Sequence, residues 1–410
     1  MTYDIVIIGG GAAGIATAAS ILKRNAQVSI AVVDPAQDHY YQPGWTLVGA
    51  GVFTPEQTRK AEADVMPKGV EWIRLPAINI DPVRQAITLG DGDTIAYRVL
   101  IVAPGLRLAW EKIAGLTEAL GRNGVTSNYR YDLAPYTYQL VQELQRGRAL
   151  FSQPPMPIKC AGAPQKAMYL SCDIWRERGV LPAIDVEFHN AGAALFGVAT
   201  YVPALMEYVE KYRINLKLES NLVAVDADRR IATFERKQNG VSERIERGFD
   251  MLHVVPPQVS HDVVAKSSLA AANGFVEVDE ATLRHKRYDN VFALGDAAGT
   301  SNAKTAAAAR KQAPVVAVNA LAALEGKPPV VDYDGYGSCP LTVERGKIVL
   351  AEFGYGGKLL PSFPSWLLNG TRPTRAAWFL KERMLPPIYW QGMLKGHEWM
   401  AAPHEIGKAA

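Results

Sequence analysis

Residues 3–14 read YDIVIIGGGAAG. The apolar run at residues 5–8 predicts a buried strand, and the small residues around Gly14 predict the helix that follows. Between them lies Gly9-x-Gly11-x-x-Gly14, a pattern typical of dinucleotide binding when a strand precedes it and a helix follows. Gly9 permits the tight turn, Gly11 lets amides approach a pyrophosphate, and Gly14 lets helix and strand pack closely.

The residues around this fingerprint extend the predicted site. The helix N-terminus supplies partial positive charge for phosphates. Asp34 ends the next apolar run, twenty residues after Gly14, where a carboxylate would bind the adenosine ribose hydroxyls. A glycine-rich turn without a ligand is the alternative, and the fingerprint alone does not separate FAD from NAD. The predicted cofactor-binding residues of this segment are Gly9, Gly11, Ala12, Ala13, Gly14, Asp34, Pro43, Ala103 and Gly105.

Length and composition limit the class of protein. The 410 residues suffice for two or three domains, and an apolar content of 48% is typical of a globular protein. A net charge of +3 is too small to argue for nucleic-acid binding. No apolar run is long enough to span a bilayer, and no signal peptide is expected before a fingerprint that begins at residue 3.

A second α/β region follows the first, but its phosphate site is missing. Apolar runs at residues 148–151, 185–189, 222–225 and 251–255 predict strands. A second glycine fingerprint should follow the first of these, yet residues 152–157 read SQPPMP. Prolines lack the amide donors that a phosphate cradle requires. The topology is therefore expected without a second nucleotide site.

Residues 290–298, NVFALGDAA, predict a buried strand that ends at Gly295 and Asp296. Asp296 would bond the ribityl hydroxyls of a flavin, and the helix after Lys304 would direct its N-terminus at the pyrimidine edge. A plain N-terminal cap is the alternative for Asp296. Together with the first fingerprint, the pattern favours FAD, with Gly295, Asp296 and Lys304 as further cofactor-binding residues.

The C-terminal region differs in character from the rest of the chain. Six aromatic residues lie between Trp366 and Trp399, interleaved with lysines and arginines, as in segments that lie at a membrane interface. The alternatives are a C-terminal cap packed on the body and a dimer interface.

Three cysteines are too few for a secreted disulfide framework. Cys160 lies between Lys159 and Lys166, and nearby cations stabilise a thiolate. Cys339 lies in YGSCP, which predicts a turn at the start of a strand, and Cys172 lies in a predicted helix, where a cysteine is usually inert. No histidine accompanies these cysteines at a metal-binding spacing, so no metal site is predicted. Two turn cysteines in a flavoprotein raise the possibility of a redox pair.

Seven segments together resemble the sulfide:quinone oxidoreductases, of the type II branch that includes the mitochondrial enzyme. They are GGGAAG at 9–14, HYYQPGWTLVGAG at 39–51, PIKCAGAPQKAMYLS at 157–171, MLHVVPPQ at 251–258, NVFALGDAAGTSNAKTAAA at 290–308, DGYGSCPL at 334–341 and AEFGY at 351–355, and YWQGMLKG at 389–396 also fits. The resemblance implies an α/β fold with two Rossmann-like domains, as in glutathione reductase, and a C-terminal amphipathic membrane-binding region. The expected domains are residues 1–113 with 285–330 for FAD, 114–284 without a nucleotide site, and 331–410 at the quinone and membrane interface.

The resemblance also implies a mechanism. Sulfide attacks a disulfide or trisulfide between Cys160 and Cys339 and leaves a persulfide on Cys339, electrons pass through FAD to a membrane quinone, and a thiophilic acceptor such as glutathione, sulfite or cyanide removes the sulfane sulfur. FAD is expected to be noncovalent, because no cysteine precedes Cys160. Peripheral or monotopic membrane association is expected, and a homo-oligomer stays open. The implied quinone neighbours are Phe353, Tyr355, Tyr389, Trp390 and Lys395.

Two other functions remain as alternatives. A type II NADH:quinone oxidoreductase shares the architecture but needs a second glycine fingerprint and no cysteine pair. A sulfide dehydrogenase flavoprotein subunit would dock a cytochrome, and it generally carries an export signal and a flavin-linking cysteine.

Overall fold

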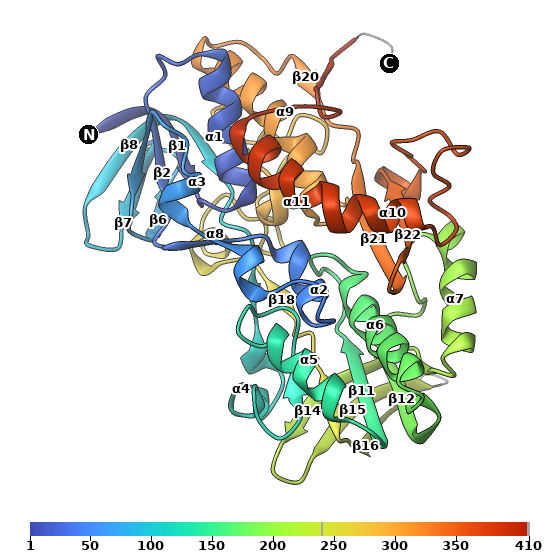
Figure 1. Ribbon diagram of the computed structural model, residues 1–410. Helices are drawn as coiled ribbons and strands as arrows, with labels where there is room; N and C mark the ends of the chain where they lie inside the picture. The colour runs from blue at the N-terminus through green and yellow to red at the C-terminus, as the bar shows by residue number, and fades with distance from the viewer. Residues whose placement is uncertain (239–240, 408–410) are drawn as a thin grey trace.

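The computed structural model describes residues 1–238 and 241–407, which form two α/β units with the C-terminal segment lying across them (Figure 1). The first unit contains a seven-stranded sheet in the order β5-β2-β1-β8-β7-β6, with β19 paired to β8. Its strands are β1 Thr2–Ile8, β2 Ile30–Val33, β5 Val70–Ile73, β6 Ala77–Asp81, β7 Ala86–Leu89, β8 Thr94–Val102 and β19 Val291–Ala293. The sheet therefore combines strands from residues 2–102 with β19, which lies almost 200 residues later in the chain.

Two long helices pack together against this sheet. They are α1, Ala12–Arg24, and α9, Ala306–Leu324. Ile5 and Ile7 of β1, Ile15 of α1 and Val316 of α9 belong to one buried cluster. This packing brings the start of α9 beside the first turn of α1, although almost 300 residues separate them.

The second unit contains a parallel five-stranded sheet in the order β10-β17-β11-β12-β13. Its strands are β10 Val125–Thr126, β17 Met251–His253, β11 Gly147–Gln153, β12 Ile184–Asn190 and β13 Asn215–Lys217. Its main helices are α5 Ala134–Glu143, α6 Ala163–Glu177 and α7 Val202–Lys211. An antiparallel sheet is added by β14 Ser220–Asp226, β15 Ile231–Gln238 and β16 Val241–Gly248. The predicted strand at 222–225 lies in this antiparallel sheet.

The C-terminal region begins with a hairpin of β21, Gly337–Glu344, and β22, Lys347–Phe353. From α10, Arg375–Phe379, the chain continues through π-helical turns and α11, Leu385–Pro387, and reaches α1 (Figure 1). Tyr389 belongs to the same buried cluster as α1 and α9. Within the described residues, no helix is both long enough and apolar enough to cross a membrane.

Short elements complete the chain. They are α2 Trp45–Val48, α3 Glu62–Val65, α4 Leu116–Ala119, α8 Asp262–Ala265, β3 Asp38–Tyr40, β4 Arg59–Ala61, β9 Arg107–Leu108, β18 Gln258–Val259, β20 Val331–Asp332 and β23 His404–Glu405. Residues 70–81 form two strands, β5 and β6, with Pro76 between them. Proline has no amide to donate to a strand ladder, which accounts for the break.

Candidate active site

The glycine turn after β1 is shaped by close backbone contacts. Gly9 has a φ of +104°, and a Cβ there would lie 2.4 Å from the carbonyl oxygen of Ala103. A Cβ on Gly14 would lie 1.9 Å from the carbonyl oxygen of Gly9. At Gly11, by contrast, no described atom lies within 4 Å of such a Cβ. The first and third glycines are thus required by packing, while the second leaves the backbone open to a ligand.

A cavity of about 530 Å³ begins at this turn and extends to Cys160 and the C-terminal segment. The predicted cofactor-binding residues that line it are Gly11, Ala12, Ala13, Asp34, Pro43, Ala103, Gly105, Gly295, Asp296 and Lys304. Gly9 and Gly14 are not in the described lining; they allow the close backbone contacts that shape the turn. The structure therefore brings together residues that span almost the whole chain.

The lining carries polar atoms suited to a flavin dinucleotide. Within the described chain, Trp45 Nε1, Thr46 Oγ1, Glu62 Oε1 and the Asn128 side-chain amide are buried without a hydrogen-bond partner. All four side chains line the cavity. A buried polar group is normally paired, so these atoms indicate a ligand with donors and acceptors. The N-terminus of α9 also lines the cavity and favours negative charge.

Two carboxylates lie beside the glycine turn. Asp34 accepts hydrogen bonds from the amides of Gly10, at 2.5 Å, and Ala36, at 2.7 Å, so it also shapes the turn. Glu62 is buried, and burial raises its pKa. Its Oε2 lies 3.2 Å from Nδ1 of His39, whose Nε2 lies 2.6 Å from the Tyr389 hydroxyl. Sequence reasoning missed Glu62, because no local pattern relates it to the fingerprint.

Lys304 supports the turn that carries Asp296. Its Nζ donates to the carbonyl oxygens of Asp296, at 3.0 Å, and Ala298, at 2.7 Å. Burial lowers the pKa of Lys304 to about 8, and the Asp296 carboxylate opposes this effect. Burial also raises the pKa of Asp296. Lys304 thus holds the backbone of the turn, and the Asp296 side chain lines the cavity.

Cys160 lines the far end of the cavity, and its Sγ lies 3.9 Å from that of Cys339. Cys339 is the third residue of β21, so it lies in the strand itself and not in the predicted turn. Cys160 has a left-handed φ of +48°. Its amide donates to the Lys304 carbonyl at 2.8 Å, and its own carbonyl accepts from the Ala163 amide at 2.7 Å. This sharp turn immediately precedes α6, whose N-terminus stabilises negative charge nearby.

Two buried lysines accompany the cysteine pair. Lys166 Nζ lies 3.1 Å from Cys160 Sγ. A hydrogen bond from the Cys339 thiol, followed by the Lys166 ammonium, holds the pKa of Cys160 well below that of a free thiol, against the effect of burial. Burial and repulsion by Lys166 lower the pKa of Lys381 to about 7. The sequence shows no reason to bring Lys381 here. Lys159 Nζ instead contacts Gln42 Oε1 at 2.5 Å.

The remaining cysteine and one glycine are explained by packing. Cys172 is fully buried on α6, and burial raises its pKa well above the ordinary range. A Cβ on Gly162 would lie 2.5 Å from Cys339 Sγ and 2.3 Å from Leu341 Cδ2. The missing side chain at Gly162 therefore makes room for Cys339, a role that sequence reasoning missed.

The five predicted quinone neighbours have different surroundings in the described chain. Tyr389 lines the cavity of the cysteines and the glycine turn. Trp390 packs beside it at 5.1 Å between ring centroids. Phe353 packs edge-to-face on Phe196, Tyr355 donates from its hydroxyl to the Glu280 carbonyl at 2.7 Å, and Lys395 is exposed.

Comparison with known proteins agrees with this arrangement. Residues 3–153 match the family model described as pyridine nucleotide-disulphide oxidoreductase. The chain is 40% identical over 395 residues to the mitochondrial sulfide:quinone oxidoreductase of Dictyostelium discoideum, covering 96% of this chain and 86% of that protein. The corresponding protein of Mus musculus is 37% identical over 396 residues, covering 96% of this chain and 87% of that protein.

Solved structures show the same fold. The sulfide:quinone oxidoreductase from Aquifex aeolicus has a TM-score of 0.79 at 19% identity, covering 98% of this chain and 96% of that one. NDH2 from Plasmodium falciparum has a TM-score of 0.56 at 14% identity, covering 73% of this chain and 64% of that one. With 37–40% identity to the two mitochondrial sulfide:quinone oxidoreductases over 96% of its length, the chain belongs to the sulfide:quinone oxidoreductase family, in its mitochondrial-like branch.

Proposed function

We propose that this protein is an FAD-dependent sulfide:quinone oxidoreductase that oxidises hydrogen sulfide to sulfane sulfur and reduces a quinone. The observation that carries the proposal is the Cys160–Cys339 pair, 3.9 Å apart, with Cys160 in the lining of the cavity that begins at the glycine turn. The glycine turn, Asp296 and the N-terminus of α9 would hold FAD. Bound FAD supplies a two-electron acceptor for the cysteine pair and a two-electron donor for quinone.

The cysteines and lysines provide the sulfur chemistry. In the oxidised pair, hydrosulfide attacks Cys339 Sγ, a new S–S bond forms there as a persulfide, and the Cys160–Cys339 bond breaks. Cys160 leaves as a thiolate, the charge that Lys166 stabilises at 3.1 Å. A thiophile such as glutathione, sulfite or cyanide then takes the outer sulfur and leaves a Cys339 thiolate. Re-forming the disulfide releases the two electrons.

FAD is proposed to be noncovalent. Of the three cysteines, two form the redox pair and Cys172 is fully buried in the second unit. Acid precipitation should therefore release all of the flavin into the supernatant, and flavin retained in the protein pellet would contradict this assignment.

The C-terminal segment is proposed to rest on a membrane and to admit quinone. Large apolar side chains are exposed along it: Trp366 at 83%, Trp399 at 59%, and Leu367 and Phe379 at 57%. The neighbouring part of the cavity is lined by Phe363, Leu380, Leu385, Ile388 and Met393. An apolar rim beside basic residues suits the interface of a bilayer. Quinone would enter between these side chains, with Tyr389 farther inside.

The test is anaerobic reduction of the purified protein by sulfide or by NADH, followed at the flavin absorbance. Sulfide should bleach the flavin and added quinone should restore it. Cys160→Ser and Cys339→Ser should each abolish this response, while Cys172→Ser retains it. Bleaching by NADH alone would instead indicate the NADH:quinone oxidoreductase. The loop after β11 carries Pro154, Pro155 and Pro157 in place of a second glycine cradle, which argues against that alternative.

A further inference from the structure

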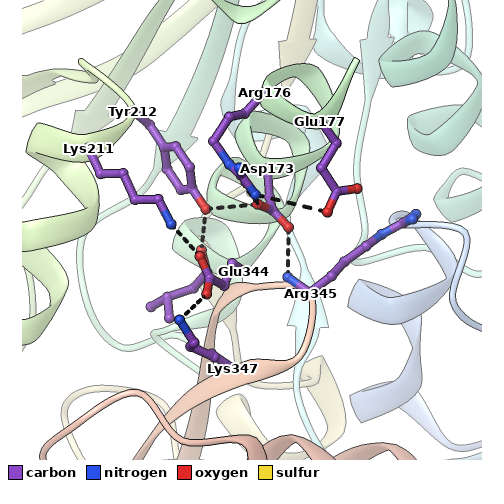
Figure 2. Close-up of polar contacts among 9 residues, drawn as sticks. Asp173, Arg176, Glu177, Lys211, Tyr212, Glu344, Arg345 and Lys347 are labelled. Carbon is purple, nitrogen blue, oxygen red and sulfur yellow. Dashed lines mark hydrogen bonds and ion pairs between the residues drawn. The ribbon is translucent and has the colours of Figure 1, made fainter. Parts of the chain in front are cut away.

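A polar cluster with a buried centre and an exposed rim lies at the opposite end of α6 from the cysteine pair (Figure 2). It joins three elements: the C-terminal half of α6, the end of α7 and the turn between β21 and β22. Its members are Asp173, Arg176, Glu177, Lys211, Tyr212, Glu344, Arg345 and Lys347. None of these residues touches the cavity of the proposed reaction within the described chain.

Asp173 is the centre of the cluster and is 1% exposed. Its Oδ2 accepts a hydrogen bond from the backbone amide of Arg345 at 2.8 Å. Its Oδ1 accepts from Arg176 Nη2 at 2.8 Å and from the Tyr212 hydroxyl at 3.3 Å. The Tyr212 hydroxyl also lies 3.0 Å from the carbonyl oxygen of Val343. Asp173 and Tyr212 thus hydrogen-bond the backbone of the hairpin at Arg345 and Val343, the residues on either side of Glu344.

The hairpin turn is held at two further points. Glu344 bonds Lys211 of α7 and pairs with Lys347 at 2.7 Å. Arg345 Nη2 donates to the carbonyl oxygen of Ala50, just after α2, at 2.5 Å. The cluster therefore fixes the hairpin against α6, α7 and the segment after α2.

The direction of the elements links this cluster to the cysteines. Gly162, at the start of α6, packs on Cys339 near the start of β21, and Asp173, near the end of α6, holds Arg345 just after β21. The helix and the strand therefore run in the same direction, away from the cysteine pair. A strand advances by about 3.3 Å per residue. A slip of β21 by a fraction of one residue along α6 would thus change the 3.9 Å separation of the sulfurs substantially.

We propose that Asp173 and Tyr212 are positioning residues that hold β21 in register along α6 and thereby keep Cys339 within reach of Cys160. The inference rests on the proposed role of this cysteine pair. This positioning matters most when the disulfide between the sulfurs is broken. The effective concentration of one thiol near the other then sets both the rate at which the disulfide re-forms and its equilibrium constant. The polar cluster supplies that proximity from about three turns of helix away, since Asp173 lies eleven residues after Gly162.

The experiment measures thiol–disulfide exchange of the FAD-loaded protein with glutathione, without sulfide or quinone. In this exchange the two cysteine thiols are oxidised to a disulfide, one glutathione disulfide is reduced to two thiols, and two protons pass to the glutathione sulfurs. Alkylation and mass spectrometry of the Cys160 and Cys339 peptides give the equilibrium constant. The variants are Asp173→Ala, Asp173→Asn and Tyr212→Phe, with Asp262→Ala as the control in the exposed Asp262–Lys266 pair.

Asp173→Ala and Tyr212→Phe should each lower this constant about tenfold, equivalent to about 30 mV. Asp173→Asn keeps an acceptor oxygen and should recover most of the loss, while Asp262→Ala should match the wild type. Tyr212→Phe removes only the hydroxyl and keeps the ring. Its exchange constant therefore tests the inference if Asp173→Ala does not fold. A constant within twofold of the wild type, even in a less stable variant, would overturn the inference. A wild-type protein that forms no Cys160–Cys339 disulfide would instead overturn the proposed function.

Discussion

Cys160 owes its predicted reactivity to the turn in which it lies. The left-handed backbone at φ +48° places the sulfur before the N-terminus of α6, and Lys166 reaches it from the first turn of that helix. The Cys339 thiol completes the surroundings as a hydrogen-bond donor. The same chemistry does not reach Cys172, which is buried twelve residues later on the opposite part of the helix.

Replacing Lys166 by Met should raise the pKa of Cys160. The variant removes an ammonium 3.1 Å from the sulfur, and a charge at this distance typically shifts a pKa by about one unit or more. The pH dependence of iodoacetamide labelling at Cys160 measures the change. Lys159→Met is the matched control, since Lys159 Nζ contacts Gln42. Equal labelling profiles in the wild type and the Lys166 variant would contradict the assignment.

Adding one methyl group at Gly162 should separate the cysteines. Its Cβ would lie 2.5 Å from Cys339 Sγ, so β21 must move, at a cost of about 1–3 kcal/mol for an overpacked site. Gly162→Ala should therefore slow sulfide oxidation and lower the free energy of unfolding. Gly197→Ala is the control, because no described atom lies within 4 Å of a Cβ there. Normal sulfide oxidation by the Gly162 variant would show that the contact is not needed.

Lys381→Met should stabilise the protein, most strongly at low pH. Burial, with repulsion by Lys166, lowers the pKa of Lys381 to about 7 in the native state, compared with about 10.4 in an unfolded chain. Between these values the unfolded chain binds a proton that the native state lacks, so wild-type stability rises with pH over this window. The destabilisation of the native state by the buried Lys381 ammonium is complete below about pH 7 and vanishes above about pH 10. The gain from Met follows that destabilisation and can reach a few kcal/mol.

Urea unfolding near pH 6 and near pH 10 measures this gain. The exposed Lys266 offers a control, since Lys266→Met removes a charge without a comparable burial penalty. A gain that stays constant as the pH rises would contradict the assigned position of Lys381. The same variant should also react more slowly with sulfide, because it removes a cation beside the sulfurs.

Among the elements, the C-terminal helical segment has two faces with different roles. One face carries Lys381 and Tyr389 into the cavity, and Leu394 is fully buried beside α1. The other face exposes Phe379 at 57%. Before α10, Trp366 is 83% exposed. The rest of this segment is anchored in the core. Its large exposed apolar side chains therefore indicate an interaction surface, such as one that binds a membrane.

Trp366→Ser combined with Phe379→Ser should weaken binding to liposomes. Burying a large apolar side chain is worth about 1.5–3 kcal/mol, so the pair should lower partitioning at least tenfold. Co-sedimentation with vesicles measures the effect, and FAD content should stay unchanged because neither side chain lines the cavity within the described residues. Val83→Ser, at an 80% exposed site on the first unit, is the control. If the double variant co-sedimented with vesicles as fully as the wild type, Trp366 and Phe379 would not be part of the membrane-binding surface.

At the scale of the whole molecule, the cavity belongs to no single unit. The glycine turn comes from the first unit, Cys160 and Lys166 from the second, and Lys381 and Tyr389 from the C-terminal region. Removal of residues from 361 onward should therefore abolish FAD retention as well as membrane binding, because Tyr389 and Leu394 are part of the core around α1. Flavin content of the purified truncated protein measures this. A truncated protein with full flavin content would show that the segment is a separable anchor.

The sequence by itself determined those features that depend on a few adjacent residues. Gly9, Gly11 and Gly14 specify one turn between a strand and a helix, since their backbone geometry is local. The prolines after Gln153 exclude a second cradle for the same reason. The α/β fold and the family follow from such local patterns in order along the chain.

Only the tertiary structure decided which distant side chains share the cavity. Lys381 meets the cysteines, Gly162 makes room for Cys339, and four of the five predicted quinone neighbours lie outside the described lining of the cavity. Each of these outcomes depends on how β21 and the C-terminal segment pack across two units. Aromatic and basic residues suit a protein core, a membrane surface and a ligand site alike, so their composition does not choose among them. Packing between segments far apart in the chain makes that choice.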